Sequence, residues 1–256
     1  MRILVCIKRV PAPGARINIT DDGQAVDTAF LGFTMSPHEE CAVEEAVRLA
    51  ALHSGEATVL TLGPGEAEEQ LRYAASIGVK KAVLLPTDGS DWDPQRTAAS
   101  IASAIQGIEA ADGAFDIILF GNESADSGGF QVGIRVALAL DRAIVNGIKG
   151  IEIDTAAGTV EAKRAVDAGF EVYKMSLPAI FGVKEGINLP RYPTMKGRLD
   201  SKKVVVASVT PEAEAGGQSL KSLRRPMESA SNTVILGHGP DAASAVVDML
   251  AELGVL

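Results

Sequence analysis

The stretch ATVLTLGPGEAEEQLRYAASIGVKKAVLL, residues 57–85, decides the fold class. It opens with an apolar run, Ala57–Leu62, and closes with a second one, Lys81–Leu85. Between them a Gly-Pro-Gly turn is followed by helical periodicity over Glu66–Ile77, which stops at Gly78. A strand, a helix and a strand in this order are typical of a parallel sheet.

The same alternation extends in both directions from this stretch. Ile3–Ile7 is a continuous apolar run, as expected of a strand that is buried on both faces, and Asp116–Phe120 is another. An Asp93-Pro94 cap begins a helix that we expect to reach about Ile108, and a shorter helix is expected over Ile134–Leu140. The pattern predicts an α/β fold with a doubly wound, mainly parallel, Rossmann-like sheet.

A further helix start is marked by Ser36-Pro37-His38-Glu39. Ser36 is a favourable N-cap, Pro37 occupies the first helical position, and Glu39 completes a capping box. Gly55 is expected to end this helix. The preceding residues, 16–35, are expected to form a hairpin around Asp21-Asp22-Gly23.

After about residue 143 the chain changes to consecutive strands. They are expected over Ile144–Ile153, Thr159–Val166, Phe170–Met175, Ala179–Val183 and Val204–Val209. We therefore expect one domain over residues 1–210. Residues 211–256 form a C-terminal arm whose short helix, over Asp241–Leu253, is expected to pack on a partner chain; an ordinary flexible tail is the alternative.

Composition excludes several classes of function. The formal net charge of −9 disfavours general binding to a phosphate backbone, and 4% aromatic residues disfavour a stacking platform for single strands, so no nucleic-acid partner is expected. No apolar run approaches the ~18 residues of a membrane span. The two cysteines, Cys6 and Cys41, have no metal-ligand spacing. A reduced thiol at Cys6 and the absence of a signal peptide predict a cytoplasmic protein.

A ligand site is expected at the carboxyl ends of the strands, where the winding of an open α/β sheet reverses. Three segments end there: Cys6 with the residues after it, the helix start Ser36–Glu39, and the glycine-rich loop Gly121–Gly133. The loop offers backbone N–H groups at a helix N-terminus, which suits a phosphate, although glycines that serve packing are an equal alternative. Within it Asp126 is a candidate acceptor for a ribose hydroxyl or an orienting group.

Ser127 and Gln131 add further polar contacts to this loop. His38 and Glu39 raise the possibility of acid–base chemistry, but capping already explains Glu39, and a lone histidine is more often a surface residue. The sequence shows no nucleophile–base pair, no paired carboxylates in a common motif and no metal triad. Hydrolytic chemistry therefore has no visible basis.

The stretch VKEGINLPRYPTMKGRLDSKK, residues 183–203, is the second segment of interest. Pro190 and Pro193 stiffen a loop over Asn188–Thr194, which cannot be helix or central strand. Cations cluster around Tyr192 and Met195, although the whole chain is acidic. A flexible apolar side chain among cations is typical of a docking surface, because methionine adapts to a pocket and the charges steer the partner. A solvated connector is the alternative.

This stretch resembles the signature of the electron transfer flavoprotein β subunit family, V-x-x-x-I-N-x-P-R-[YF]-P-[ST]-x-K-G followed by a basic tail. Four other segments resemble the family in the same order: MRILVCIKRV, MSPHEECAVEEAVRL, LTLGPGEAEEQLRYAASIGVKKAVLL and GNESADSGGFQVG. The resemblance covers the chain from its start to about Lys203.

The resemblance implies an adenine-nucleotide-binding domain in a heterodimer with an α subunit that carries a redox-active FAD. The β subunit would hold AMP, or a second FAD in bifurcating members. Such a heterodimer takes electrons from flavin dehydrogenases, such as the acyl-CoA dehydrogenases of fatty acid oxidation. It passes them to a quinone oxidoreductase or another acceptor, so this chain would be an electron-carrier subunit rather than an enzyme with its own substrate.

Carried over by position, the resemblance implies two groups of site residues. The nucleotide would be surrounded by Cys6, Ser36, Pro37, His38, Glu39, Leu62, Gly121, Asn122, Asp126, Ser127, Gly128, Gly129, Phe130, Gln131, Val132 and Gly133. The dehydrogenase would be bound by Arg191, Tyr192, Pro193, Thr194, Met195, Lys196, Arg198, Lys202 and Lys203. Met195 stands where many members carry a leucine anchor.

The chain departs from the family pattern at several positions. Ser36 replaces the usual Asn, His38 replaces an aromatic residue, and Ala12-Pro13 stands where D-Y is common, so the flavin environment on this side differs. Val132 matches many bifurcating or nitrogen-fixation-type members, in which the β subunit has its own FAD and oxidises NADH, and this subtype is one alternative. A stand-alone ATP- or AMP-binding domain of universal-stress type is another.

Overall fold

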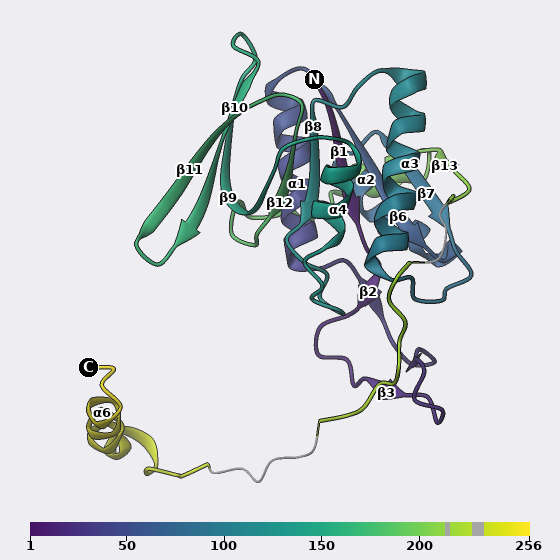
Figure 1. Ribbon diagram of the computed structural model, residues 1–256. Coiled ribbons are helices and arrows are strands. Elements are labelled where there is room, and N and C mark those ends of the chain that lie inside the picture. Colours follow the sequence, from purple (N-terminus) through teal and green to yellow (C-terminus); the bar gives the residue numbers. More distant parts are fainter. Residues whose placement is uncertain (213–215, 227–232) are drawn as a thin grey trace.

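A computed structural model describes residues 1–212, 216–226 and 233–256. A nine-stranded sheet runs through the molecule in the order β11-β10-β9-β12-β8-β1-β6-β7-β13 (Figure 1). The strands are β1 (Arg2–Ile7), β6 (Glu56–Gly63), β7 (Lys81–Pro86), β8 (Ile117–Gly121), β9 (Ile144–Asp154), β10 (Thr159–Val166), β11 (Gly169–Ser176), β12 (Ala179–Val183) and β13 (Val206–Ser208). All neighbours pair in parallel except β9 with β10 and β10 with β11, so the α/β, mainly parallel sheet is confirmed.

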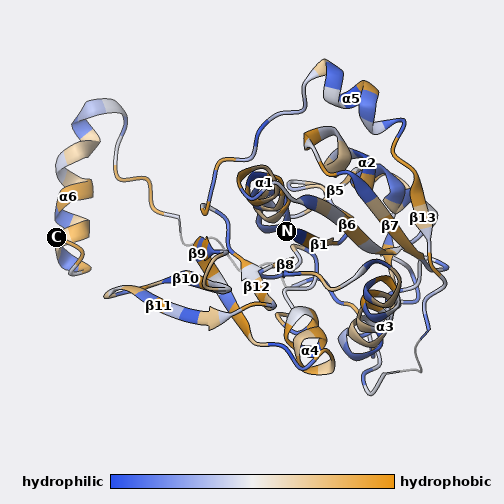
Figure 2. Cartoon of the chain, turned by 90° about the horizontal axis from the view of Figure 1, so that it is seen from above, coloured by the Kyte–Doolittle hydropathy of each residue, from blue (hydrophilic) through white to orange (hydrophobic). Residues whose placement is uncertain are grey.

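Helices cover both faces of the sheet (Figure 2). The helices on the sheet are α1 (Pro37–Leu52), α2 (Glu68–Ile77), α3 (Pro94–Asp112) and α4 (Val132–Ala139). Two further described helices are α5 (Met195–Ser201), which packs on α2, and α6 (Ala243–Glu252). Alternate residues of β1 enter different cores: Ile3 and Val5 pack with α1 and α2, whereas Leu4 and Cys6 pack with α3 and α4. The continuous apolar run of β1 therefore follows from burial on both faces.

The start of α1 agrees with the capping prediction. The Ser36 hydroxyl accepts the Glu39 N–H at 3.3 Å, and the Glu39 carboxylate accepts the Ser36 N–H at 2.8 Å. Pro37 occupies the first turn, where its missing N–H costs no hydrogen bond. The capping box fixes where the chain turns from the sheet edge into α1.

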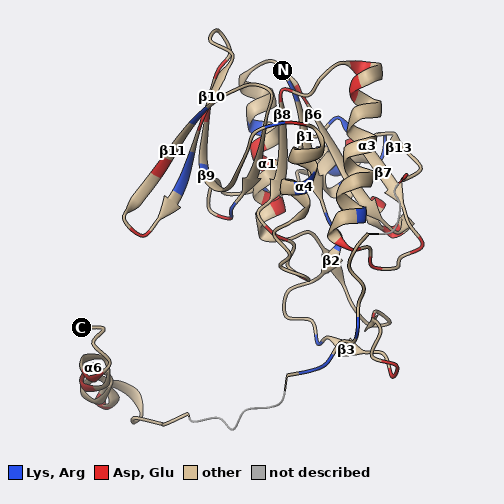
Figure 3. Ribbon diagram, viewed as in Figure 1, with Lys and Arg blue, Asp and Glu red and all other residues tan. Residues whose placement is uncertain are grey.

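The hairpin expected within residues 16–35 is present as two short strands, β3 (Asn18–Ile19) and β4 (Val26–Asp27). A second small pair, β2 (Val10–Pro11) with β5 (Phe33–Thr34), joins its base to the body. The basic part of the C-terminal arm passes this hairpin (Figure 3). There the Leu223 N–H donates to the Gly23 carbonyl at 2.8 Å, so the arm is bound to the domain at this point.

Three elements differ from the expectations. Helix α3 continues past Ile108 to Asp112, because Gly107 faces open space and one glycine weakens a helix without ending it. The last strand is shorter than Val204–Val209 and comprises only β13. Finally, α5 begins directly after the expected loop Asn188–Thr194, at residues where no helix was expected.

Helix α6 lies within the predicted range 241–253 and is preceded by a 3₁₀ turn, Gly239–Ala242. It stands apart from the sheet in Figure 1, and several of its apolar side chains, among them Val247 and Leu253, are exposed. The parts of the predicted arm at 213–215 and 227–232 lie outside the described residues. Among the described residues, no helix has the length and apolarity that crossing a bilayer requires.

Candidate functional site

The winding of the sheet reverses at β1. From β1 the chain proceeds through α1 to β6 on one side, and later it returns through α3 to β8 on the other. The carboxyl ends of β1 and β8 are therefore neighbours, with Cys6 paired to Phe120. The three segments that the sequence placed here meet at this edge, which is the topological switch point where the ligand crevice is expected.

Glu39 joins two of these segments. One carboxylate oxygen accepts the N–H of Lys8, the first residue after β1, at 2.8 Å, and the other accepts the N–H of Ser36. The side chain is almost fully buried, and burial raises the pKa of Glu39 to about 7 although both hydrogen bonds oppose this shift. Glu39 is thus a buried carboxyl that holds the end of β1 against the start of α1.

The loop after β8 is seated on this carboxyl. A Cβ atom at Gly121 would lie 2.7 Å from the Glu39 Cγ, so only glycine fits here without a shift. The Ser36 hydroxyl donates to the Glu123 carbonyl at 3.4 Å, and the Asn122 N–H donates to the Val183 carbonyl at 2.8 Å. These contacts fix where the loop leaves the sheet.

Asp126 lies opposite the end of β1. The Lys8 ammonium is 2.5 Å from an Asp126 carboxylate oxygen, and the other oxygen accepts the Ser127 N–H at 2.8 Å. Burial alone would raise the pKa of Asp126, but the Lys8 charge and the hydrogen bonds outweigh it, and the net pKa is lowered. Asp126 is therefore ionised at neutral pH and accepts hydrogen bonds only.

The second half of the loop exposes backbone donors. Gly128 has a φ of +54° and donates its N–H to the Ser124 carbonyl at 2.9 Å, which turns the chain toward α4. Among the described residues, the next three N–H groups, those of Gly129, Phe130 and Gln131, have no hydrogen-bond partner. A row of free N–H groups before a helix N-terminus is a donor set that suits a phosphate, so the residues present fit the phosphate part of a nucleotide.

The remaining predicted site residues lie in or after the loop and at the ends of β1 and β6. Gly133 sits in the first turn of α4, where a Cβ would lie 3.2 Å from the Phe120 ring. Gln131 accepts from the Arg135 guanidinium at 3.1 Å. Burial raises the pKa of the Cys6 thiol, so it stays neutral, and Leu62 lies half-buried near the end of β6.

His38 connects the crevice to the chain that follows β12. Its Nδ1 accepts the Glu185 N–H at 2.8 Å, so its proton is on Nε2, which is 3.4 Å from a Glu123 carboxylate oxygen. Both ring nitrogens are thus engaged in joining two loops. The sequence alone did not reveal this bridge, because Glu123 and Glu185 lie in unrelated segments.

The predicted docking segment is anchored at its beginning. The Asn188 amide donates to the Cys41 carbonyl and to a Glu45 oxygen, both at 3.0 Å. The Arg191 guanidinium pairs with the buried carboxylate of Glu44 at 2.6 Å. Arg191 therefore binds α1 through Glu44, while its side chain stays half exposed.

The expected loop over Asn188–Thr194 is present, and directly after it the chain forms α5, a helix that the sequence pattern did not indicate. Thr194 caps it by accepting the Gly197 N–H at 3.0 Å, a hydrogen bond that explains why a helix begins directly after two prolines. Gly197 packs against the end of α2, where an added Cβ would lie only 2.2 Å from the Ser76 carbonyl oxygen. Helix α5 is thus held on the outer side of α2 (Figure 2).

The outer face of α5 and the loop before it is apolar. Tyr192 is 91% exposed and Met195 is 77% exposed, and Leu189 and Leu199 are exposed beside them. Lys196, Arg198, Lys202 and Lys203 are exposed on the same segment. Sequence reasoning missed Leu189 and Leu199; the spacing of four between Met195 and Leu199 was a helical signal.

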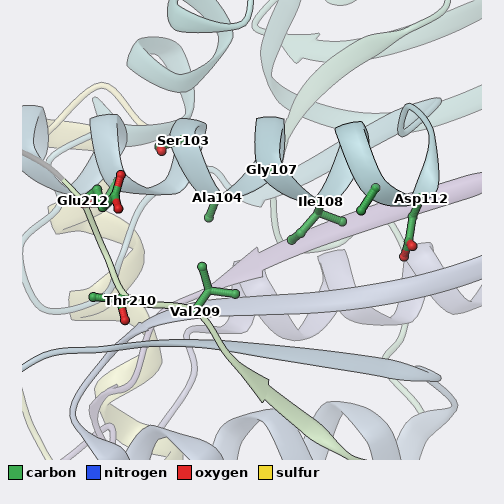
Figure 4. Close-up of a pocket in the computed structure, with 10 residues that line it drawn as sticks. Ser103, Ala104, Gly107, Ile108, Asp112, Val209, Thr210 and Glu212 are labelled. Atoms are coloured by element: carbon green, nitrogen blue, oxygen red, sulfur yellow. The ribbon is translucent and has the colours of Figure 1, made fainter.

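A groove of about 430 Å³ lies away from the crevice, between α3 and the chain after β13 (Figure 4). Ala104, Gly107 and Ile108 line it on one side and Val209 and Thr210 on the other. None of the predicted site residues contributes to it. Within the described part of the chain, no cluster of three or more histidine, cysteine or acidic side chains suits a metal ion.

The fold defines the class of open, doubly wound α/β proteins, in which ligands bind at the switch point of the sheet. The chain belongs to the electron transfer flavoprotein domain family, whose model matches residues 26–214. It is 30% identical to the electron transfer flavoprotein subunit beta of Bacillus subtilis strain 168, over 98% of this chain and 97% of that protein.

Two further relatives are similar to most of this chain. Identity is 34% to the electron transfer flavoprotein subunit beta of Syntrophomonas wolfei, over 83% of this chain and 81% of that protein. It is 33% to protein FixA of Rhizobium meliloti strain 1021, over 78% of this chain and 68% of that protein. The β subunit resemblance seen in the sequence is confirmed.

Proposed function

We propose that this chain is the β subunit of a cytoplasmic, heterodimeric electron carrier that docks flavin dehydrogenases through the segment 189–203. The observation that carries the proposal is the exposed apolar surface of Tyr192, Met195 and their neighbours, ringed by cations on an acidic protein. Because α5 is capped by Thr194 and anchored on α2, the surface is preorganised, which a mere connector would not require.

In this proposal an α subunit carries the FAD, which supplies the electron-transfer chemistry when bound. The present chain binds AMP at the switch-point crevice, with its phosphate near the free N–H groups of Gly129–Gln131 and its ribose near Asp126. The exposed apolar side chains of α6 support packing of the C-terminal arm on the α subunit. Acyl-CoA dehydrogenases are the proposed donors, and a quinone oxidoreductase is the proposed acceptor.

A second candidate is the bifurcating type, in which this chain binds its own FAD and the complex oxidises NADH. The similarity to protein FixA and the valine at position 132 favour it. A stand-alone domain of universal-stress type accounts neither for the family match over residues 26–214 nor for the exposed apolar surface around Met195.

Nucleotide content separates these candidates. The chain is co-expressed with its α subunit, the purified complex is denatured, and the released nucleotides are quantified by chromatography and mass. We expect one FAD and one AMP per heterodimer. Two FADs with reduction by NADH establish the bifurcating type, and a chain that forms no heterodimer and releases only ATP or AMP refutes the β subunit proposal.

Replacing Met195 with alanine is expected to lower kcat/KM for reduction by an acyl-CoA dehydrogenase roughly tenfold, the loss of a central interface anchor. Flavin content should not change, because Met195 is exposed on α5, which packs on α2 and not on the loop Gly121–Gly133. Leu138→Ala on α4 is the matched control, since that side chain is 83% exposed in a helix outside the docking segment. Equal kinetics in both variants would refute the docking assignment.

A further inference from the structure

We infer that Lys8 binds the phosphate of the adenine nucleotide, a role that rests on the proposed nucleotide site and adds to it a residue that sequence reasoning did not single out. Lys8 directly follows β1 and therefore stands at the switch point itself. Its side chain extends from the end of β1 to the glycine-rich loop and contacts Asp126 there.

The backbone of Lys8 is held in place by a hydrogen bond to Glu39. Its N–H donates to Glu39, whose carboxyl is almost fully buried and is covered by Gly121. The base of the lysine side chain is thus held by the same carboxyl that positions the start of α1 and the loop. Because its backbone is fixed, the Lys8 side chain is more preorganised for binding than a lysine on a freely moving surface segment.

The ammonium of Lys8 has N–H donors that are not used within the described structure. Among the described residues its one hydrogen-bond partner is Asp126, and an ammonium group has three N–H donors. Lys8 can therefore keep Asp126 and donate to a phosphate oxygen at the same time. Gly129 is three positions after Asp126, a span of at most about 11 Å, so the free N–H groups are within reach of the same ligand.

The charges around the loop favour such a cation. The loop itself carries two carboxylates: Asp126 contacts Lys8 at the end of β1, and Glu123 contacts His38 at the start of α1. An anionic ligand would be repelled by them without compensation. His38 beside Glu123 accepts through Nδ1 and is accounted for as a bridge between loops. Lys8 is the described cation that contacts this wall of the loop.

The inference is tested by comparing AMP with adenosine, which lacks the phosphate. Their dissociation constants are measured by calorimetry on the heterodimer after removal of its nucleotide. For Lys8→Gln we expect AMP binding to weaken roughly tenfold to a hundredfold, the range of one charge-assisted hydrogen bond, with adenosine binding changed less than about threefold. Lys8→Arg keeps the charge and should retain most of the AMP affinity.

Lys163→Gln is the matched control. In wild type the Lys163 ammonium on β10 pairs with Glu152 on β9 at 2.8 Å, and neither residue belongs to the proposed nucleotide site. It should leave both dissociation constants unchanged. In the wild-type complex, salt should weaken AMP binding more than adenosine binding, which tests the charge without any substitution.

Equal weakening of AMP and adenosine in Lys8→Gln, or equal salt dependence of the two, would overturn the inference and make Lys8 a purely structural ion-pair partner. A wild-type complex that binds neither compound would overturn the proposed nucleotide site and the role of Lys8 with it. Normal AMP binding by wild type and by Lys8→Gln alike refutes only the assignment of Lys8.

Discussion

The free energy of unfolding is expected to fall by roughly 2 kcal/mol between pH 5 and pH 8 through the titration of Glu39 alone. Burial raises the folded-state pKa of Glu39 to about 7, whereas an unfolded glutamate titrates near 4.5. The folded state therefore binds the extra proton between these values. The stability that the raised pKa of Glu39 contributes is fully present below pH 4.5. It is lost as pH rises through the folded-state pKa.

Glu39→Gln isolates this effect, because glutamine has the same shape and does not ionise. Its amide nitrogen accepts no hydrogen bond, so the Lys8 or the Ser36 N–H loses its acceptor and the variant should be less stable by about 1–3 kcal/mol at pH 5. Urea unfolding of both proteins from pH 5 to pH 8 gives the difference. The three histidines are present in both proteins and cancel in it.

The difference in unfolding free energy between wild type and Glu39→Gln should become smaller as pH rises. Only wild type loses stability by ionisation at this position. The pKa of Asp126 is lowered by its partners, so that carboxylate is already ionised throughout this range and adds no slope. A constant gap from pH 5 to pH 8 would show that Glu39 titrates as an ordinary glutamate.

Replacing Gly197 with alanine is expected to destabilise the protein by about 1–3 kcal/mol, as overpacking does. The added Cβ would lie 2.2 Å from the Ser76 carbonyl oxygen, a backbone atom at the end of α2 that cannot move aside alone. Helix α5 must shift, and the docking surface around Met195 shifts with it. Reduction by a dehydrogenase should therefore slow more than tenfold, while nucleotide and flavin content stay as in wild type.

Gly107→Ala is the matched control for this substitution. Gly107 is also a helical glycine, but an added Cβ there meets nothing within 4 Å. Alanine favours the helix over glycine, so this variant should gain about 0.5–1 kcal/mol of stability. Opposite signs in the two variants, measured by chemical denaturation, confirm the contact between α5 and α2; a gain in both would contradict it.

Much of the fold was predictable because its signals are local. The Ser36 capping box and the helical stop at Gly78 act within a few residues, and both were found where expected. Helix α5 was missed for a similarly local reason: the prolines before it exclude helix, and the Thr194 cap that restarts one was overlooked. The ion pair of Arg191 was not predicted, because its partner Glu44 lies on a helix that is distant in sequence.

The sequence by itself determined the strands, the helices of the sheet layers, the family and the segments that carry the proposed site. Tertiary structure alone decided how these segments act together. Lys8 contacts Glu39 across 31 residues and Asp126 across 118, and no local pattern encodes such pairs. Parallel strands bring their carboxyl ends to one edge whatever their separation along the chain, and the assembled edge is where a buried carboxyl, a lysine and a free row of N–H groups come together.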